Sequence, residues 1–166
     1  MTLLVATVAP GFAILTQDTA WGVAEKAAPE LLARCAVTAD GFSPDAYPGA
    51  PGGEVAPTTF HGGKIVVCPG LKAAVGGAGC MATHVGFSYA LAERGVATIE
   101  EIVEEAPQML TRAWSGEHGG YMAVTVGWSD IEQRAIGFAF ASGEGFAPRR
   151  MEQGSGHALH PAPAMD

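Results

Sequence analysis

Two short apolar runs, separated by only two residues, open the chain. The runs are Leu3–Ala9 and Phe12–Thr16, with Pro10-Gly11 between them. Proline followed by glycine is typical of a tight turn, so the pattern predicts a β-hairpin. The runs are apolar at nearly every position instead of every second one, which indicates strands that are covered on both faces. The chain is therefore expected to begin with a buried hairpin.

The segments after this hairpin predict a helix, a long loop and a second pair of strands. Val23–Arg34 has the composition of a helix, and residues 40–57 are rich in proline and glycine, as long loops are. Lys64–Cys68 and Leu71–Val75 are apolar runs joined by Pro69-Gly70, so a hairpin is expected there. Three glycines are expected to form a tight bend into the next helix, namely Gly76, Gly77 and Gly79.

Two helices are predicted in the middle of the chain. The first, Cys80–Arg94, has apolar residues near helical spacing and is followed by Gly95, which favours a left-handed cap. Thr98 followed by Glu101 is the pattern of a capping box, so a second helix is expected to begin there and to end at Gly119-Gly120. Its apolar face is expected to consist of Ile99, Ile102, Val103, Ala106, Leu110 and Trp114.

Strands are predicted again after the helices. Tyr121–Trp128 and Arg134–Ala141 have the pattern of a hairpin, Phe146–Met151 that of a short strand, and residues 157–166 form a tail rich in proline and alanine. Strands on both sides of a helix pair are typical of an α+β fold in which helices pack on antiparallel sheets. We therefore expect one domain at residues 1–156, with a long loop at about 21–63.

Composition excludes several classes of protein. The chain has 166 residues and a net charge of −8, from 9 basic and 17 acidic residues. An acidic chain suits neither nucleic acid nor an anionic membrane surface. No apolar run approaches the ~18 residues of a membrane span, and no basic segment precedes Leu3 as in a signal peptide. We therefore expect a soluble cytoplasmic protein.

The residue types that hold metals and cofactors form no recognisable site. Cys35, Cys68 and Cys80 lack the spacing of zinc or dithiol sites, so idle thiols are expected. The five histidines are not spaced as metal ligands on a helix, and neither a metal nor a cofactor is expected. The glycines at 76–79 leave two interpretations open, a backbone anion site at a helix N-terminus and a tight strand-to-helix turn.

Thr2 is the remaining candidate for chemistry. Methionine before a small residue is normally removed, which would leave the α-amine of Thr2 beside its own hydroxyl. A threonine hydroxyl is a weak nucleophile that needs a base. An α-amine, with a pKa of about 7.7–8.0, suits that role at neutral pH.

The order of these motifs resembles that of proteasome β-subunits and bacterial proteasome-like peptidases, which are N-terminal nucleophile hydrolases. Thr2 and Asp18 are 16 residues apart (18 − 2), like the family's opening threonine and its acidic position. Lys64 opens a strand, turn and glycine bend similar to the family's lysine strand, and Gly154-Ser155-Gly156 is similar to its Gly-Ser-Gly segment. The resemblance implies a sandwich of antiparallel sheets and packed helices of the four-layer αββα type, shortened at its C-terminal end.

The resemblance also implies roles for five residues. Thr2 would be the nucleophile, and Lys64, paired with Asp18, would lower the pKa of its amine or hydroxyl. The backbone N–H of Gly79 would stabilise the oxyanion, and Ser155 would hydrogen-bond near the Thr2 amine. The implied activity is that of a threonine-type enzyme that cleaves peptide or other amide bonds, with a peptide or protein as substrate.

Three departures from the family pattern keep an alternative open. Trp21–Gly63 is longer than the family's link between its acidic residue and its lysine, and only ten residues follow Gly156 (166 − 156). Gly77 stands where many members have a larger residue, which is expected to open the specificity pocket. The alternative is an inactive proteasome-fold subunit of a ring or a virion, which would retain Met1.

Self-association is expected for either function. The predicted helix Cys80–Arg94 carries no lysine, arginine, aspartate or glutamate before Glu93. A helix that is apolar all round is usually buried on two sides, and only one side can face the chain's own sheet. A homo-oligomer, as a closed ring or stacked rings, is therefore expected.

Overall fold

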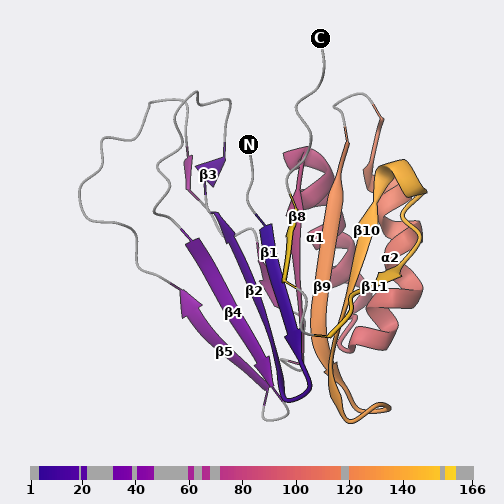
Figure 1. Cartoon of the computed structure of the whole chain (residues 1–166). Coiled ribbons are helices and arrows are strands. Elements are labelled where there is room, and N and C mark those ends of the chain that lie inside the picture. Colours follow the sequence, from indigo (N-terminus) through magenta and orange to yellow (C-terminus); the bar gives the residue numbers. More distant parts are fainter. Residues whose placement is uncertain are drawn as a thin grey trace.

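Two antiparallel sheets and a pair of helices make up the fold (Figure 1). The computed structural model describes residues 4–18, 20–21, 32–38, 41–46, 60–61, 65–67, 72–116, 120–153 and 156–159. Within these residues the fold is α+β, as the order of strand and helix patterns predicted. The layers follow one another as first sheet, second sheet and helix pair.

The first sheet is built on the predicted N-terminal hairpin. β1 (Leu4–Ala9) and β2 (Phe12–Asp18) pair antiparallel across the turn at Pro10-Gly11. The strand order in this sheet is β12-β1-β2-β4-β5. Its other strands are β4 (Leu32–Thr38), β5 (Gly41–Ala46) and β12 (Gly156–Leu159). A separate two-stranded ribbon joins β3 (Ala20–Trp21) and β6 (Phe60–His61).

The second sheet lies in the middle of the molecule. Its order is β11-β10-β9-β8-β7. The bounds of these strands are β7 (Val66–Val67), β8 (Ala73–Ala78), β9 (Met122–Ser129), β10 (Arg134–Ala141) and β11 (Arg149–Arg150). All six residues of β8 are buried, because the first sheet covers one face of this strand and the helices cover the other. Burial on both faces explains why β8 is small and apolar throughout.

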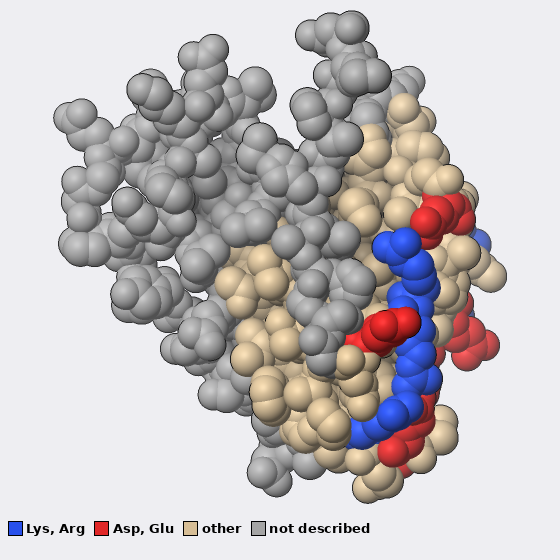
Figure 2. Space-filling view, in the orientation of Figure 1, with Lys and Arg blue, Asp and Glu red and all other residues tan. Residues whose placement is uncertain are grey.

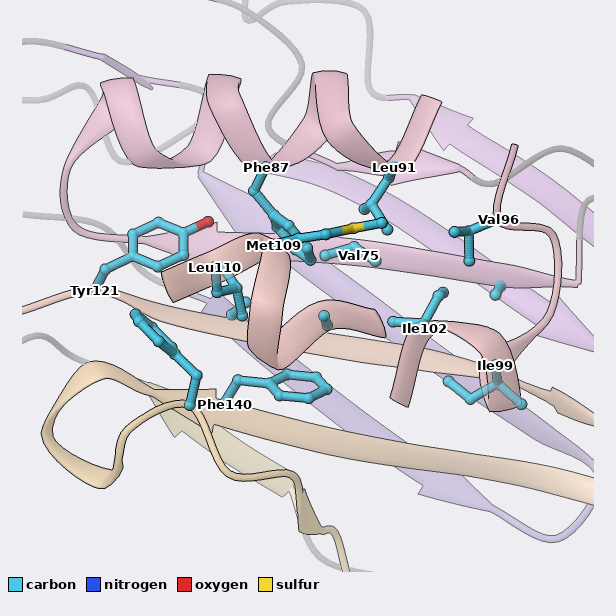
Figure 3. Packing of buried hydrophobic residues seen from close by; sticks show 14 of the residues in the cluster. Val75, Phe87, Leu91, Val96, Ile99, Ile102, Met109, Leu110, Tyr121 and Phe140 are labelled. Carbon is cyan, nitrogen blue, oxygen red and sulfur yellow. The ribbon is translucent and has the colours of Figure 1, made fainter. Parts of the chain in front are cut away.

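Two apolar clusters hold the three layers together. Between the sheets, side chains of β1 and β2 such as Leu4 and Leu15 pack against alanines and valines of β8, β9 and β10. Between the second sheet and the helices, Phe87 and Leu91 of α1 (Met81–Arg94) point toward Met109 of α2 (Ile99–Ala113), as Figure 3 shows. The same cluster contains Ile99, Ile102, Met109, Tyr121, Phe140 and Phe146.

The predicted helix caps are confirmed, but α2 ends earlier than predicted. Gly95 caps α1 in the left-handed conformation, and Thr98 and Glu101 form both hydrogen bonds of a capping box at the start of α2. α2 ends at Ala113, well before the predicted stop at Gly119-Gly120. The backbone is already extended at Trp114, whose ring packs edge-on against Phe146 with centroids 5.7 Å apart. The sequence pattern that predicted the helix carries no information on this tertiary contact.

Two predictions in the first half of the chain are wrong within the described residues. Residues 32–34, predicted as the end of a helix, belong to β4, where pairing with β2 overrides helical composition. Gly41–Ala46 forms β5, although a loop was predicted for residues 40–57. Pro44 is tolerated there because β5 is the edge strand of its sheet. Residues 22–31 and 47–57 lie outside the described part of the chain.

Three more boundaries differ from the predictions. Gly76 and Gly77 belong to β8, and only Gly79 lies in the bend before α1. Within the predicted strand Phe146–Met151, only Arg149–Arg150 pairs, as β11, because Phe146 lies in a left-handed turn with a φ of 59°. The chain then forms a strand where no pattern was found: β12 pairs with β1 and extends the first sheet.

Candidate functional site

Several strand ends and the start of α1 meet at one end of the sandwich, which is uppermost in Figure 1. β1 begins opposite the end of β2, because Leu4 pairs with Gln17. β7 begins opposite the middle of β8, because Val66 pairs with Val75, and its pairing with β8 is antiparallel, so the residues before Val66 lead toward the end of β8. β8 leads into α1 through the two residues Gly79 and Cys80. Segments from both sheets and from the helix layer therefore converge here.

Gln17 joins the two sheets at this end. Its side chain is fully buried, at 0% exposure. The Gln17 Oε1 accepts a hydrogen bond from the Gly77 N–H at 3.3 Å, and the Gln17 Nε2 donates to the Gly77 carbonyl. Because buried backbone groups need partners, these two bonds fix the end of β2 against the end of β8.

A buried polar pair lies on the other side of Gly77. The His84 Nδ1 and the Tyr121 hydroxyl are 2.8 Å apart, and the two residues are only 4% and 1% exposed. A Cβ at position 77 would collide with the Tyr121 hydroxyl and with the His84 ring. The expectation that Gly77 opens a specificity pocket is therefore wrong, because Tyr121 and His84 fill the space that such a pocket would need.

The ionisation state of Tyr121 follows from its burial. Removal from water raises the pKa of the Tyr121 hydroxyl far above its ordinary value, and the nearby charge of an ionised Cys80 raises it further. The hydroxyl therefore stays protonated over the whole physiological range. It remains able to donate as well as accept in its contact with His84.

Gly79 and Cys80 form the turn from β8 into α1. Gly79 is exposed and has a φ of 119°, which other residue types rarely adopt. Cys80 is the N-cap of α1. Burial would raise the pKa of the Cys80 thiol, but hydrogen bonds from Thr83 and the Ala82 backbone outweigh burial and lower it. More of this thiol is therefore ionised near neutral pH than of an ordinary cysteine.

Of the five predicted site residues, the structure describes Gly79 in full and Asp18 in its backbone. Asp18 is the last residue of β2 and directly follows Gln17. Thr2 and Lys64 lie outside the described residues, but each is close in sequence to a described strand. β1 begins two residues after Thr2, and β7 begins two residues after Lys64. The segments nearest to these four residues thus come together at one end of the sandwich.

The fifth predicted residue, Ser155, also lies outside the described residues. The next residue, Gly156, begins β12 and pairs with Thr7, whereas Leu159 pairs with Leu4 at the start of β1. β12 therefore runs toward the convergent end and starts away from it. The described strands do not bring the neighbourhood of Ser155 to the end where β1 begins.

The most constrained residues of this site were not among those predicted from the sequence. These residues are Gln17, His84 and Tyr121, and Cys80 lies beside them as an ionisable thiol. One sequence signal was available, since a glutamine within an otherwise apolar strand needs a buried partner. Another was the pair Gly76-Gly77, because glycine inside a strand often marks the close approach of other groups.

Neither a metal centre nor a membrane span is seen in the described ranges. No group of three or more His, Cys, Asp or Glu side chains in that part of the chain is placed to hold a metal ion. Likewise, neither of the helices described there is long and apolar enough to cross a bilayer.

Comparison with known proteins finds similarity in the fold alone. No protein-family model matches the chain, and no curated protein matches it. Among solved structures, the chain is similar to a mutant of Anbu from Hyphomicrobium sp. strain MC1, with a TM-score of 0.61 and 11% sequence identity. The match covers 98% of this chain but only 62% of the Anbu chain, so this chain spans less than two thirds of the length of its neighbour. Anbu is a proteasome-like protein, and the similarity of this chain to it is one of fold.

Proposed function

We propose that this chain is a proteasome-like N-terminal nucleophile hydrolase of the threonine type, which cleaves peptide or other amide bonds. Its two sheets and helix pair would then be a shortened αββα sandwich, with residues 1–156 as its single domain. The convergence of β1, β2, β7, β8 and α1 at one end of the sandwich carries this proposal. The similarity to the Anbu fold supports it independently.

The proposed chemistry starts with removal of Met1. The hydroxyl of Thr2 would attack the carbonyl carbon of the substrate, while the Thr2 α-amine takes the hydroxyl proton. The proton would then pass to the leaving amine, so that an ester links the acyl group to Thr2. Water would hydrolyse this ester and restore the free hydroxyl.

The other proposed site residues would act by electrostatic stabilisation. Lys64, held by Asp18, would keep the Thr2 amine in its basic form, because a nearby cation lowers the pKa of an amine. The N–H of Gly79 would stabilise the oxyanion. In this scheme Gln17 would hold the strand of Asp18 against the strand that leads to Gly79, through its bonds to Gly77.

The experiment that tests this function reads the N-terminus and its reactivity together. Intact mass of the purified full chain reports whether Met1 is removed. The chain is then treated with a peptide β-lactone, which acylates an activated hydroxyl, and the site of the adduct is mapped. We expect an adduct on Thr2, retention of this adduct in Thr2→Ser, and its loss in Thr2→Ala with an unchanged melting temperature.

Two results would contradict the proposal, and the first of them would favour the inactive subunit. One is an intact Met1 together with no adduct at residue 2. The other is hydrolysis of a peptide substrate by Thr2→Ala at the wild-type rate, which would assign the activity to another group. Cys80→Ala serves as the control, because Cys80 is an ionisable thiol at this end of the sandwich and would otherwise be a competing target of the lactone.

A further inference from the structure

One face of α1 is both apolar and exposed. Buried side chains line the opposite face, where Phe87 and Leu91 point toward the core (Figure 3). The exposed stripe follows helical spacing and consists of Ala82, Val85, Gly86, Tyr89 and Ala92. Tyr89 is 73% exposed and Val85 is 42% exposed. Within the single chain α1 is thus buried on one side only, although burial on two sides was predicted.

A groove runs beside this stripe, between α1 and α2. It has a volume of about 600 Å³. Its apolar lining comes from Gly86 and Ala90 of α1 and from Met109 and Ala113 of α2, and its polar and charged lining comes from Glu93, Arg94, Glu105, Gln108 and Arg112. Gly86 lets the two helices approach closely, since a Cβ there would lie only 3.4 Å from that of Ala113. The stripe therefore presents an aromatic ridge at Tyr89 close to a hollow at Gly86.

We propose that this face of α1 binds a second copy of the chain, with the two α1 helices packed antiparallel about a two-fold axis. With the axis near residue 87, Tyr89 of one copy lies over Val85 and Gly86 of the other, and the same contact occurs twice. Ridge and hollow are thus complementary within one surface, as a two-fold interface requires. The proposal does not depend on the proposed hydrolase activity.

The distribution of charge along α1 is compatible with this arrangement. The chain has a net charge of −8, so most surfaces of two copies repel each other, whereas the stripe from Ala82 to Ala92 carries no lysine, arginine, aspartate or glutamate. The first turn of α1 contains no acidic residue to balance the positive end of its dipole. In the antiparallel pair, the exposed Glu93 of each copy lies beside that positive end in the other copy.

The test uses sedimentation equilibrium of the full chain at micromolar concentration. The wild type is expected to dimerise, and Tyr89→Lys or Val85→Glu is expected to weaken the dimer about ten-fold or more. Ile131→Lys is the matched control, because Ile131 is 80% exposed in the turn between β9 and β10, outside the stripe, and its replacement should change nothing. Equal melting temperatures of the variants establish that they remain folded.

Mixtures of variants then test the orientation. In an antiparallel pair, residue 89 of one copy meets residue 85 of the other, so mixing Tyr89→Lys with Val85→Glu should restore a dimer through the new ion pair. A dimer restored instead by mixing Tyr89→Lys with Tyr89→Glu would indicate parallel helices and overturn the proposal. A monomeric wild type, or an assembly that neither Tyr89→Lys nor Val85→Glu weakens, would overturn it as well.

Discussion

Gly77 provides the most direct test at the scale of a single residue. Its missing side chain leaves room for the Tyr121 hydroxyl and the His84 ring. We expect Gly77→Ala to lower the free energy of unfolding by about 1–3 kcal/mol, the usual cost of overpacking a buried site. Adding Tyr121→Phe, which removes the nearest atom, should recover part of that loss. Chemical denaturation of the single and double variants measures both effects.

A second glycine serves as the control for this cycle. Around Gly143, nothing lies within 4 Å of an added Cβ, so Gly143→Ala should leave the stability nearly unchanged. If the losses caused by Gly77→Ala and Tyr121→Phe simply add, the hydroxyl is not the obstacle that the geometry describes.

The thiol of Cys80 predicts a pH dependence that can be measured directly. Hydrogen bonds from Thr83 and Ala82 stabilise the thiolate, so the pKa of Cys80 lies below the ordinary value. Alkylation of Cys80 by iodoacetamide should therefore persist to lower pH than alkylation of a free cysteine peptide. Peptide mapping separates its signal from those of Cys35 and Cys68. Thr83→Val, which removes one of the donors, should move the midpoint of the alkylation rate to higher pH, and no movement would refute the assignment.

At the scale of elements, one carboxylate fastens the β9–β10 turn to the edge strand β11. The Glu132 Oε2 accepts hydrogen bonds from Arg134 at 2.5 Å and from Arg150 at 2.6 Å. Arginine and acidic side chains lie together on the face shown in Figure 2. The two guanidinium groups, Arg150 first, lower the pKa of Glu132 to about 2.

This pKa sets the sign of a pH effect on stability. The carboxyl is more acidic in the folded chain than in the unfolded one, where its pKa is about 4.3. Its stabilisation is therefore complete above that value and disappears as the pH falls through about 2. We expect Glu132→Gln to have a slightly lower melting temperature than the wild type at pH 7, and the difference to close on acidification. Glu104→Gln, at an exposed position of α2, is the matched control for the loss of one surface carboxylate.

The elements that were predicted correctly are those whose signals are local. Pro10-Gly11 defines a hairpin, and Thr98 with Glu101 defines a helix start, because the atoms that interact are a few residues apart. Residues 32–34 and β12 were missed because pairing with distant strands determines them. The same distinction applies to the candidate site. The strand ends that form it could be predicted from the order of the motifs. The contact of Gln17 with Gly77 could not, because it joins residues 60 positions apart in two different sheets.

For the whole molecule, the pairing of β12 with β1 predicts the effect of truncation. Without β12, β1 becomes an exposed apolar edge, which is prone to pair with other chains. A chain that ends at Gln153 should therefore melt at lower temperature and scatter light on heating. A chain that ends at Leu159 keeps β12 and should behave as the full chain does. Identical melting of the two truncated chains would show that β12 contributes nothing to the first sheet.

Because β12 pairs with β1, the order of the strands along the chain can be changed without changing the sheets that they form. Leu4 and Leu159 are partners in the ladder, so their Cα atoms lie about 5 Å apart, a distance that a short linker can span. The chain could thus be circularly permuted, with Leu159 joined to Leu4 and new ends opened at the exposed turn Asp130–Gln133. Such a protein would keep every sheet contact described above, yet it would lack Thr2 and its α-amine. The stability of the architecture could then be measured apart from the proposed N-terminal chemistry.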